Sequence, residues 1–324
     1  MSNKNKVTQN IDCLFIHVPN LITNGSHDPI FFINMIAIGL FSISNELKKN
    51  GFTPQIINLG VEKAVDFNFN IAKYIQENNI KIIGLSLQWC RQIYDTLAVA
   101  ESIKKINPDI FIFLGGITSS AFATEILKDY LQIDAVVKGE GEKPIVELVN
   151  KIKNQDFTFS DIPNINWRDK EGKIHKNKKL WFANEDELNS FSFIGLDFLK
   201  NHEIYLKFPM HYRKKSSNLE ENICVHPAIN CCLGRGCPGN CTWCGGGYQA
   251  TQKISGRNKI TIRKPQIVAN EIIQLKKSYP DILFHISYDP FPKNQDYLIE
   301  IFNLLGKNMF KQIHMNFECF CVAY

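Results

Sequence analysis

Short apolar runs alternate with helix-like segments along the first half of the chain. The runs at 12–18, 54–59, 81–85, 109–114 and 135–137 indicate buried strands, and the segments between them have the apolar spacing of amphipathic helices. Strands separated by helices pair in parallel, because each helix returns the chain to the same end of the sheet. The pattern therefore predicts an α/β domain with a doubly wound parallel sheet over residues 1–152.

The chain of 324 residues is long enough for two domains that each bury a core. Residues 153–221 are charged and irregular, except for a hairpin that we predict around Gly172, and we interpret them as a linker with a small β element. From residue 222 a strand, a cysteine-rich loop, a helix, a strand, a helix and a third strand follow one another. This order predicts the first half of a β/α barrel over residues 222–324.

Parallel sheets bind ligands at the carboxyl ends of their strands, so the loops there form the candidate site of the first domain. A pair of glycines lets the backbone approach a bulky ligand, although it is equally typical of a plain tight turn. Neither a GxGxxG dinucleotide motif after the first strand nor a Gly-rich Lys-Ser/Thr loop is present in the sequence. The candidate residues of three consecutive strand ends are Ser86 and Leu87, then Gly115, Gly116 and Thr118, then Gly139, Glu140, Gly141 and Glu142.

Three cysteines of the second domain, Cys237, Cys241 and Cys244, have Cys-x3-Cys-x2-Cys spacing and glycines on both sides. Three thiolates on one loop can bind three irons of a [4Fe-4S] cube and leave the fourth iron open for another ligand. Structural zinc normally shows two Cys-x2-Cys pairs, but zinc stays an alternative because further cysteines lie nearby. These nearby cysteines are Cys224, Cys231 and Cys232.

Composition bears on the cellular compartment and on the classes of partner that the protein can have. Most of the ten cysteines are clustered between 224 and 244, which favours a metal site in a reducing compartment over disulfides. The first ten residues are polar and lack the apolar core of a secretory signal, and the apolar stretch 29–43 is shorter than the roughly 20 residues of a membrane span. The net charge of +5 is modest and spread out. We therefore predict a cytoplasmic protein and no nucleic-acid or membrane partner.

Two motifs resemble the cobalamin-dependent branch of the radical SAM enzymes. Leu-Gly-Gly-Ile-Thr at 114–118, followed by Asp-Ala-Val-Val-Lys-Gly-Glu-Gly-Glu at 134–142, is similar to the cobalamin-binding domain that precedes the catalytic domain in many of them. Cys-Pro-Gly-Asn-Cys-Thr-Trp-Cys-Gly-Gly at 237–246 is similar to the superfamily signature. Arg263 lies at a position that resembles one where arginine is frequent in these members. The alternative, a solvated charge, is about equally compatible with the sequence. The Asp-x-His-x-x-Gly motif is absent, so the lower cobalt face would be open or covered by a side chain at 86–89.

The resemblance implies three cofactors: a [4Fe-4S] cluster on the three cysteines, S-adenosylmethionine on the open iron, and cobalamin on the loops of the first domain. It implies reductive cleavage of S-adenosylmethionine to a 5′-deoxyadenosyl radical and, commonly, methyl transfer to an unactivated carbon. Trp243, Gly245 and Gly246 would lie beside the cosubstrate. Asp289 and Glu318 would bind its ammonium or ribose, and each is equally a surface or capping carboxylate. No residue is assigned a catalytic role.

Such an enzyme needs a small-molecule or peptide substrate and an electron donor, namely a reductase with flavodoxin or a ferredoxin. Because a radical SAM barrel has more βα units than the three strands predicted here, we expect another segment or chain to complete it, or the chain to be a fragment. Two alternatives stay open. One is a cobalamin-independent radical SAM enzyme that catalyses methylthiolation, cyclisation or rearrangement, and the other is an inactive truncated product.

Overall fold

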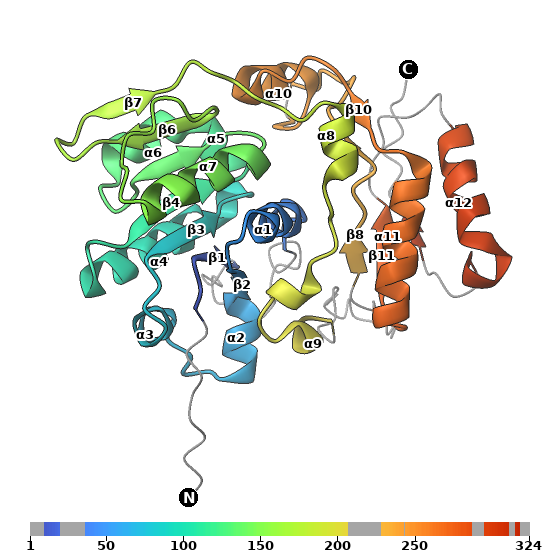
Figure 1. The fold of residues 1–324 in the computed structure, drawn as a ribbon, viewed down its shortest axis with the longest axis horizontal. Helices are drawn as coiled ribbons and strands as arrows, with labels where there is room; N and C mark the ends of the chain where they lie inside the picture. The colour runs from blue at the N-terminus through green and yellow to red at the C-terminus, as the bar shows by residue number, and fades with distance from the viewer. Residues whose placement is uncertain are drawn as a thin grey trace, which may run out of the picture.

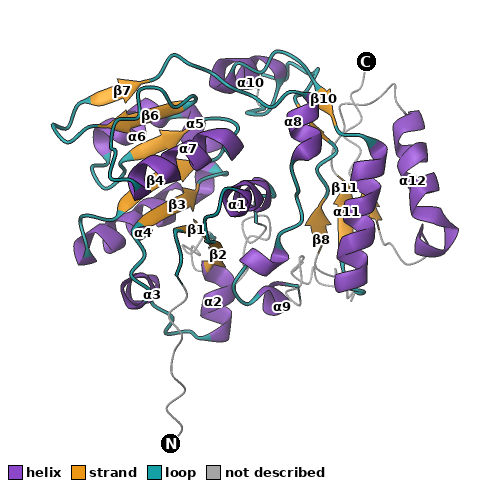
Figure 2. Cartoon of the chain, in the orientation of Figure 1, coloured by secondary structure: helices purple, strands orange, loops and turns teal. Residues whose placement is uncertain are grey.

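The computed structural model describes residues 10–19, 36–206, 228–242, 244–286, 295–310 and 315–317. An N-terminal part, from β1 to β7, holds a seven-stranded sheet, and a C-terminal part, from β8 to β12, holds a three-stranded parallel sheet. Figures 1 and 2 show the two parts side by side, with α1 (Gly39–Lys49) between them and α10 (Tyr248–Ser255) across the top. The predicted fold class is confirmed.

The seven-stranded sheet has the order β2-β1-β3-β4-β5-β6-β7. The first five strands are parallel, as the alternation with helices predicts: β1 (Cys13–His17), β2 (Pro54–Asn58), β3 (Ile82–Ser86), β4 (Phe111–Gly115) and β5 (Ala135–Val137). The predicted hairpin forms β6 (Ile165–Arg168) and β7 (Ile174–Lys176), which extend this sheet in antiparallel fashion from β5. The hairpin is therefore part of the N-terminal sheet.

Helices cover both faces of this sheet, because successive side chains of a strand point to opposite faces. Leu14 and Leu114 pack in one apolar cluster with α3 and α4, whereas Phe15 and Phe113 pack in another with α1 and α7. The segment between β4 and β5 holds two helices that meet at Phe122, and a short helix follows β2 without a break. The helices beyond α1 are α2 (Leu59–Val65), α3 (Ile71–Glu77), α4 (Ile93–Ile106), α5 (Ile117–Ala121), α6 (Ala123–Asp129) and α7 (Glu142–Lys153), with a 3-10 turn at Cys90–Gln92.

A connecting segment, residues 177–206, leads to the C-terminal part. It contains α8 (Glu185–Ser190), a 3-10 turn at Leu196–Phe198 and α9 (His202–Tyr205). The C-terminal sheet has the order β12-β11-β8, and β9 and β10 form a separate antiparallel pair. Its elements are β8 (Ala228–Asn230), β9 (Gly234–Arg235), β10 (Thr261–Ile262), α11 (Pro265–Ser278), β11 (Leu283–Ile286), α12 (Gln295–Phe310) and β12 (Met315–Phe317).

One apolar cluster joins the two parts. It contains Phe113 of β4 and Phe41 of α1, continues through Leu196 of the connecting segment, and reaches Ile272 of α11 and Phe284 of β11. The N-terminal sheet and the C-terminal sheet thus rest against a common core. Within the described residues, no helix is both long and apolar enough to cross a bilayer.

Gly84 in the middle of β3 allows two aromatic rings to meet. Phe15 and Phe113 pack edge to face with 6.2 Å between ring centroids, and a Cβ atom on Gly84 would lie 2.7 Å from atoms of both rings. We therefore expect Gly84→Val to lower the free energy of unfolding by about 1–3 kcal/mol, the usual cost of overpacking a core. Urea unfolding measures it. Gly39→Ala, where a Cβ atom meets nothing within 4 Å, is the control, and equal midpoints for the two variants would contradict the packing.

Candidate functional site

Four neighbouring strands of the N-terminal sheet end in a row of residues, of which three are polar. His17 of β1 is in register with Ser86 of β3, which is in register with Gly115 of β4. Asn58 lies beside His17 on β2, and both are buried. Sequence reasoning identified Ser86 and Gly115 but missed His17 and Asn58, whose only signal was a polar residue at the end of an apolar run. The row lies at the carboxyl ends of the strands, where sheets of this kind bind ligands.

The three predicted loops are hydrogen bonded to one another. Leu87 N donates to Gly115 O at 2.8 Å, which ties the loop after β3 to the loop after β4. Gly139 N donates to Ser120 Oγ at 3.0 Å, which ties the loop after β5 to α5. Thr118 is buried, and its Oγ1 donates to the carbonyl oxygen of Gln88 at 3.0 Å. The loops therefore form one connected surface.

The two glycines after β4 have different roles. Gly116 has a φ of +114°, and a Cβ atom there would lie 2.5 Å from Leu87 O, so this position tolerates no side chain. At Gly115 a Cβ atom would meet nothing within 4 Å. Gly116 therefore fixes the path of the loop, and Gly115 leaves backbone open to an approaching ligand.

We expect Gly116→Ala to lower the free energy of unfolding by about 1–3 kcal/mol, because alanine is strained in this region of φ and ψ. Thermal unfolding followed by circular dichroism checks the expectation. Gly115→Ala is the matched control and should unfold like the wild type. A Gly116→Ala variant with unchanged stability would show that the loop takes another path.

The cysteine loop directs backbone N–H groups at sulfur. Gly239 N donates to Cys237 Sγ at 3.3 Å, and Gly246 N donates to Cys244 Sγ at 3.4 Å. A Cβ atom on Gly239 would lie 3.5 Å from Cys237 Sγ and 3.6 Å from Cys241 Sγ, so two of the thiols lie close around this glycine. Hydrogen bonds to sulfur stabilise the charge of a thiolate and tune the potential of a cluster bound to it. These contacts fit the predicted cluster.

The thiols of Cys231 and Cys232 differ from those of the loop. Burial raises the pKa of Cys231 far above its ordinary value and that of Cys232 to about 11. Cys231 packs against the apolar cluster that contains Phe284, and Cys232 packs against the one that contains Phe191 and Phe193, which favours a core role over the zinc alternative. Cys224 lies outside the described residues. In the described part of the chain, no three His, Cys, Asp or Glu side chains converge as the ligands of a single ion would; the thiolates of a cube each bind a different iron.

The cysteine loop lies against the loops of the N-terminal part. A Cβ atom on Gly245, next to Cys244, would lie 3.1 Å from Cγ2 of Ile117, the first residue of α5 after the paired glycines. Gly139 packs in the same way against Ser255 at the end of α10, where a Cβ atom would lie 2.4 Å from Ser255 Cβ. The candidate sites of the two parts are therefore adjacent.

Glu140 and Glu142 face the C-terminal part. Glu140 accepts hydrogen bonds from Arg235 and Arg257, and Glu142 accepts from Arg235. Burial would raise the pKa of Glu140, but the two guanidinium groups outweigh burial and lower it below its ordinary value. Both side chains are thus ion paired, and their direct contact with a cofactor stays a prediction. Gly141 between them packs closely on Ile145.

Three predicted ligands of the cosubstrate, Trp243, Asp289 and Glu318, lie outside the described residues. Arg263 is described, and it is buried rather than solvated: only 1% of it is exposed, so the alternative of a solvated charge is wrong.

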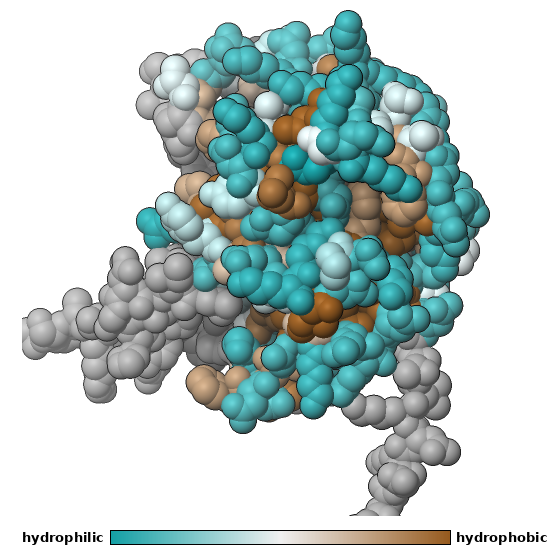
Figure 3. Space-filling model, turned by 90° about the vertical axis from the view of Figure 1, so that its left-hand side faces the viewer, coloured by the Kyte–Doolittle hydropathy of each residue, from teal (hydrophilic) through white to brown (hydrophobic). Residues whose placement is uncertain are grey.

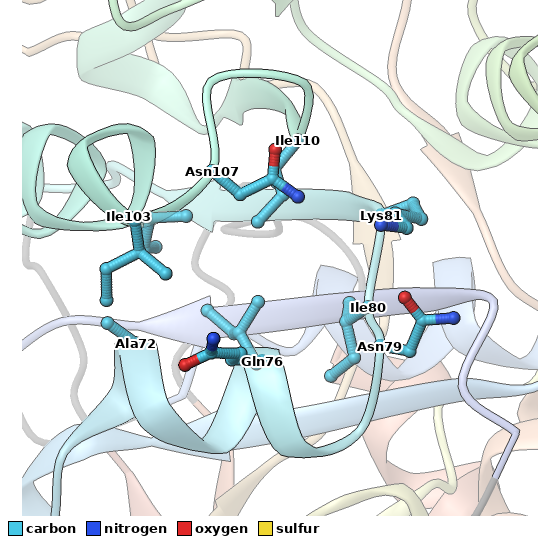
Figure 4. Close-up of a pocket in the computed structure, with 10 residues that line it drawn as sticks. Ala72, Gln76, Asn79, Ile80, Lys81, Ile103, Asn107 and Ile110 are labelled. Carbon is cyan, nitrogen blue, oxygen red and sulfur yellow. The ribbon is translucent and has the colours of Figure 1, made fainter.

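A small cavity of about 180 Å³ lies far from these loops (Figure 4). It lies between α3 and α4, with Ala72 and Ile103 in its lining. Lys81 and Ile110, which also line it, immediately precede β3 and β4. The cavity is therefore at the amino ends of the strands and holds none of the candidate residues. On the face seen in Figure 3, apolar residues form small separate areas in a mostly hydrophilic surface.

The N-terminal part matches a known family of domains. Residues 34–149, which contain α1 to α6 and most of α7, match the family model of the B12 binding domain. This segment is similar to the B12 binding domain. The resemblance to the cobalamin-dependent radical SAM enzymes that the two motifs predict is confirmed.

Several curated relatives match longer parts of the chain. The anaerobic magnesium-protoporphyrin IX monomethyl ester cyclase of Rubrivivax gelatinosus is 28% identical over 203 residues, which are 62% of this chain and 32% of the cyclase. The cytidylyl-2-hydroxyethylphosphonate methyltransferase of Streptomyces wedmorensis is 23% identical over 82% of this chain and 53% of its own length. The hopanoid C-3 methylase of Methylococcus capsulatus is 23% identical over 41% of this chain and 25% of its own length.

A solved structure has the same fold. The cobalamin-dependent S-adenosylmethionine radical enzyme OxsB, with aqua-cobalamin and S-adenosylmethionine bound, superimposes with a TM-score of 0.59 at 16% identity. The match covers 91% of this chain and 37% of the OxsB chain, so both parts of the chain and their order have counterparts there. The chain spans between a quarter and about half of the length of the three curated relatives.

Proposed function

We propose that this chain holds the cobalamin and iron–sulfur sites of a radical SAM enzyme that transfers a methyl group to an unactivated carbon. The observation that carries the proposal is the 3.1 Å approach of the Gly245 Cβ position to Ile117. It brings the cysteine loop to the glycine loop of the B12-binding domain, so one substrate carbon could lie within reach both of the radical generated at the cluster and of the methyl group carried by cobalamin. Two of the three relatives described above are named methyltransferase or methylase.

Each set of residues has a defined part in this proposal. Cys237, Cys241 and Cys244 would hold the cluster, and the N–H groups that point at their sulfur atoms would stabilise its negative charge. Gly115 would leave room for the corrin ring beside the polar row of strand ends. When bound, the cluster supplies the electron that cleaves S-adenosylmethionine, and cobalamin supplies the methyl group.

The cosubstrate would lie between these groups. Gly245 and Gly246 lack side chains and let it approach the loop, and Trp243, Asp289 and Glu318 stay proposals as its further ligands. We also propose a small-molecule or peptide substrate, a flavodoxin or ferredoxin as electron donor, and a cytoplasmic location. The name of the Rubrivivax relative makes cyclisation the second candidate reaction.

Reconstitution of the full chain tests the proposal. Under anaerobic conditions with iron, sulfide and hydroxocobalamin, we expect one corrinoid and one four-iron cluster per chain, and 5′-deoxyadenosine after addition of S-adenosylmethionine and dithionite. A chain that forms 5′-deoxyadenosine but stays colourless with hydroxocobalamin would support the cobalamin-independent alternative. A chain with a full cluster and no cleavage would support the inactive one.

Gly115→Leu tests where the corrinoid binds. A side chain here meets no protein atom within 4 Å at its Cβ position, so the fold should be unaffected. The same side chain would occupy the space that we assign to the corrin ring, and we expect a rise in the corrinoid Kd of about tenfold or more, which corresponds to about 1.4 kcal/mol. Titration followed by absorbance gives the Kd. An unchanged Kd would place the corrinoid elsewhere.

A further inference from the structure

Arg235 lies where a short strand meets the cysteine loop. It is the last residue of β9, two residues before Cys237, the first cysteine of the loop. β9 pairs with β10, where Arg235 lies opposite Thr261. Gly236, between Arg235 and Cys237, has a φ of +94° and passes so near Lys259 O that a Cβ atom would lie 2.8 Å away. The backbone between Arg235 and Cys237 is therefore short and closely packed, so a shift of Arg235 would move the cysteine loop.

The side chain of Arg235 is held by two carboxylates of the B12-binding domain. Its Nη1 atom lies 2.7 Å from Glu140 Oε2 and 3.1 Å from Glu142 Oε2, and its Nη2 atom donates to Glu142 Oε1. A guanidinium group that meets a carboxylate through two parallel N–H bonds has a fixed orientation, which a lysine would lack. Its plane also lies over the ring of Phe193, 5.6 Å from the centroid. The contact is thus directional.

The two carboxylates are themselves anchored. Glu142, of whose side chain 1% is exposed, is the first residue of α7 and accepts from Ser42 Oγ of α1 at 2.5 Å. A carboxylate at this end of a helix is favoured by the helix dipole. Glu140 accepts from Ala183 N at 3.0 Å and from Arg257 Nε at 2.5 Å. The pair therefore belongs to the framework of the N-terminal part rather than to a loose surface.

Charge and burial strengthen this arrangement. The Arg235 side chain is 17% exposed, and breaking such a pair leaves a charge that water reaches poorly. The link from Glu142 through Arg235 to Cys237 should therefore stay intact in the folded protein.

We propose that Arg235 is a positioning residue that fixes the cysteine loop at a set distance from the cofactor loops of the B12-binding domain. The inference rests on the proposed function, because it assumes that the cysteines hold the cluster and that cobalamin binds the N-terminal loops. Glu142 holds the guanidinium, the guanidinium holds the end of β9, and β9 places the first cluster ligand. The distance between the two cofactors therefore depends on this ion-paired side chain, in addition to the packing of Gly245 on Ile117 and of Gly139 on Ser255.

Pulsed electron paramagnetic resonance of the full, reconstituted chain tests this inference. The reduced cluster and cob(II)alamin each carry an unpaired electron, and their dipolar coupling reports the distance between them. We expect one narrow distance distribution in the wild type. In Glu142→Gln and in Arg235→Lys we expect a clearly broadened one, with iron and corrinoid contents per chain unchanged. Loss of the cluster with the corrinoid retained in these variants would likewise support the inference.

Glu271→Gln is the matched control, because Glu271 forms a bidentate pair with Arg263 inside the C-terminal part. It should lower stability and leave the distance distribution narrow. A narrow distribution in both Glu142→Gln and Arg235→Lys, or equal broadening in the control, would overturn the inference while the proposed function stands. A wild-type chain that binds neither cluster nor corrinoid overturns the proposed function and this inference with it.

Discussion

Alanine at Cys237, Cys241 or Cys244 is expected to abolish binding of the iron–sulfur cluster in each single variant. A site with three protein ligands cannot hold a cube on two. The Cys237 variant also removes the sulfur atom that accepts from Gly239 N, and the Cys244 variant removes the one that accepts from Gly246 N. Iron and sulfide should fall from about four of each per chain, the content of one cube, to near zero. Metal analysis and Mössbauer spectroscopy of anaerobically reconstituted protein measure this loss.

Two other cysteines serve as controls for this experiment. Cys90 is exposed and Cys13 is buried in β1, and both are free thiols of the N-terminal part. Cys90→Ser and Cys13→Ala should keep the full iron content, although the second leaves a small cavity in the core. Iron loss of the same size in the controls would contradict the assignment of the three loop cysteines as cluster ligands. Retention of the cluster by any single variant of the loop would mean that another residue can serve as ligand.

Replacement of Arg263 by leucine should cause the largest loss of stability among single changes discussed here. The guanidinium is fully buried and forms two bonds with Glu271, of 2.7 Å and 2.9 Å. It also donates to the carbonyl oxygens of Cys232 and Phe191, which joins the strand end before the cysteine loop to the connecting segment. We expect Arg263→Leu to lower the free energy of unfolding by about 3–5 kcal/mol, because Glu271 would keep a poorly hydrated and unpaired charge.

A double variant separates the cost of leaving Glu271 unpaired from the cost of losing the hydrogen bonds to the carbonyl oxygens. Arg263→Leu combined with Glu271→Leu removes both charges and should recover most of the stability, since an apolar pair replaces a buried ion pair at little cost. Lys105→Leu, which breaks the exposed pair with Glu101, should change the stability by less than about 1 kcal/mol. Chemical unfolding of the four proteins gives the comparison. A double variant as unstable as Arg263→Leu would assign the loss to the carbonyl contacts instead.

Much of the fold could be predicted because local pattern and tertiary structure agree. The apolar runs that indicate strands are buried on both faces in the parallel sheet, and amphipathic helices such as α4 occupy the segments between them. Short helices were missed where no breaker separates them from their neighbours. Helix α2 follows β2 directly, and its N-cap is Asn58, which also ends the strand.

The candidate site could be predicted only in part. Spacing alone predicts that Cys237, Cys241 and Cys244 are cluster ligands, and this assignment stays a prediction. The partners of Glu140 and Glu142 could not be predicted, because Arg235 lies 95 and 93 residues further along the chain. A Gly-Glu-Gly-Glu motif predicts a loop at a strand end but does not indicate which side chains from a distant segment approach it.

The apolar cluster that runs from Phe113 through Phe41 and Leu196 to Phe284 bears on how the protein can be handled. If the N-terminal part were expressed alone, the apolar side chains that α11 and the connecting segment normally cover would be exposed to water. Such a half-protein would tend to precipitate or to be captured by chaperones. Dissection into separately expressed pieces is thus a poor route to either cofactor, and binding studies should use the undivided polypeptide.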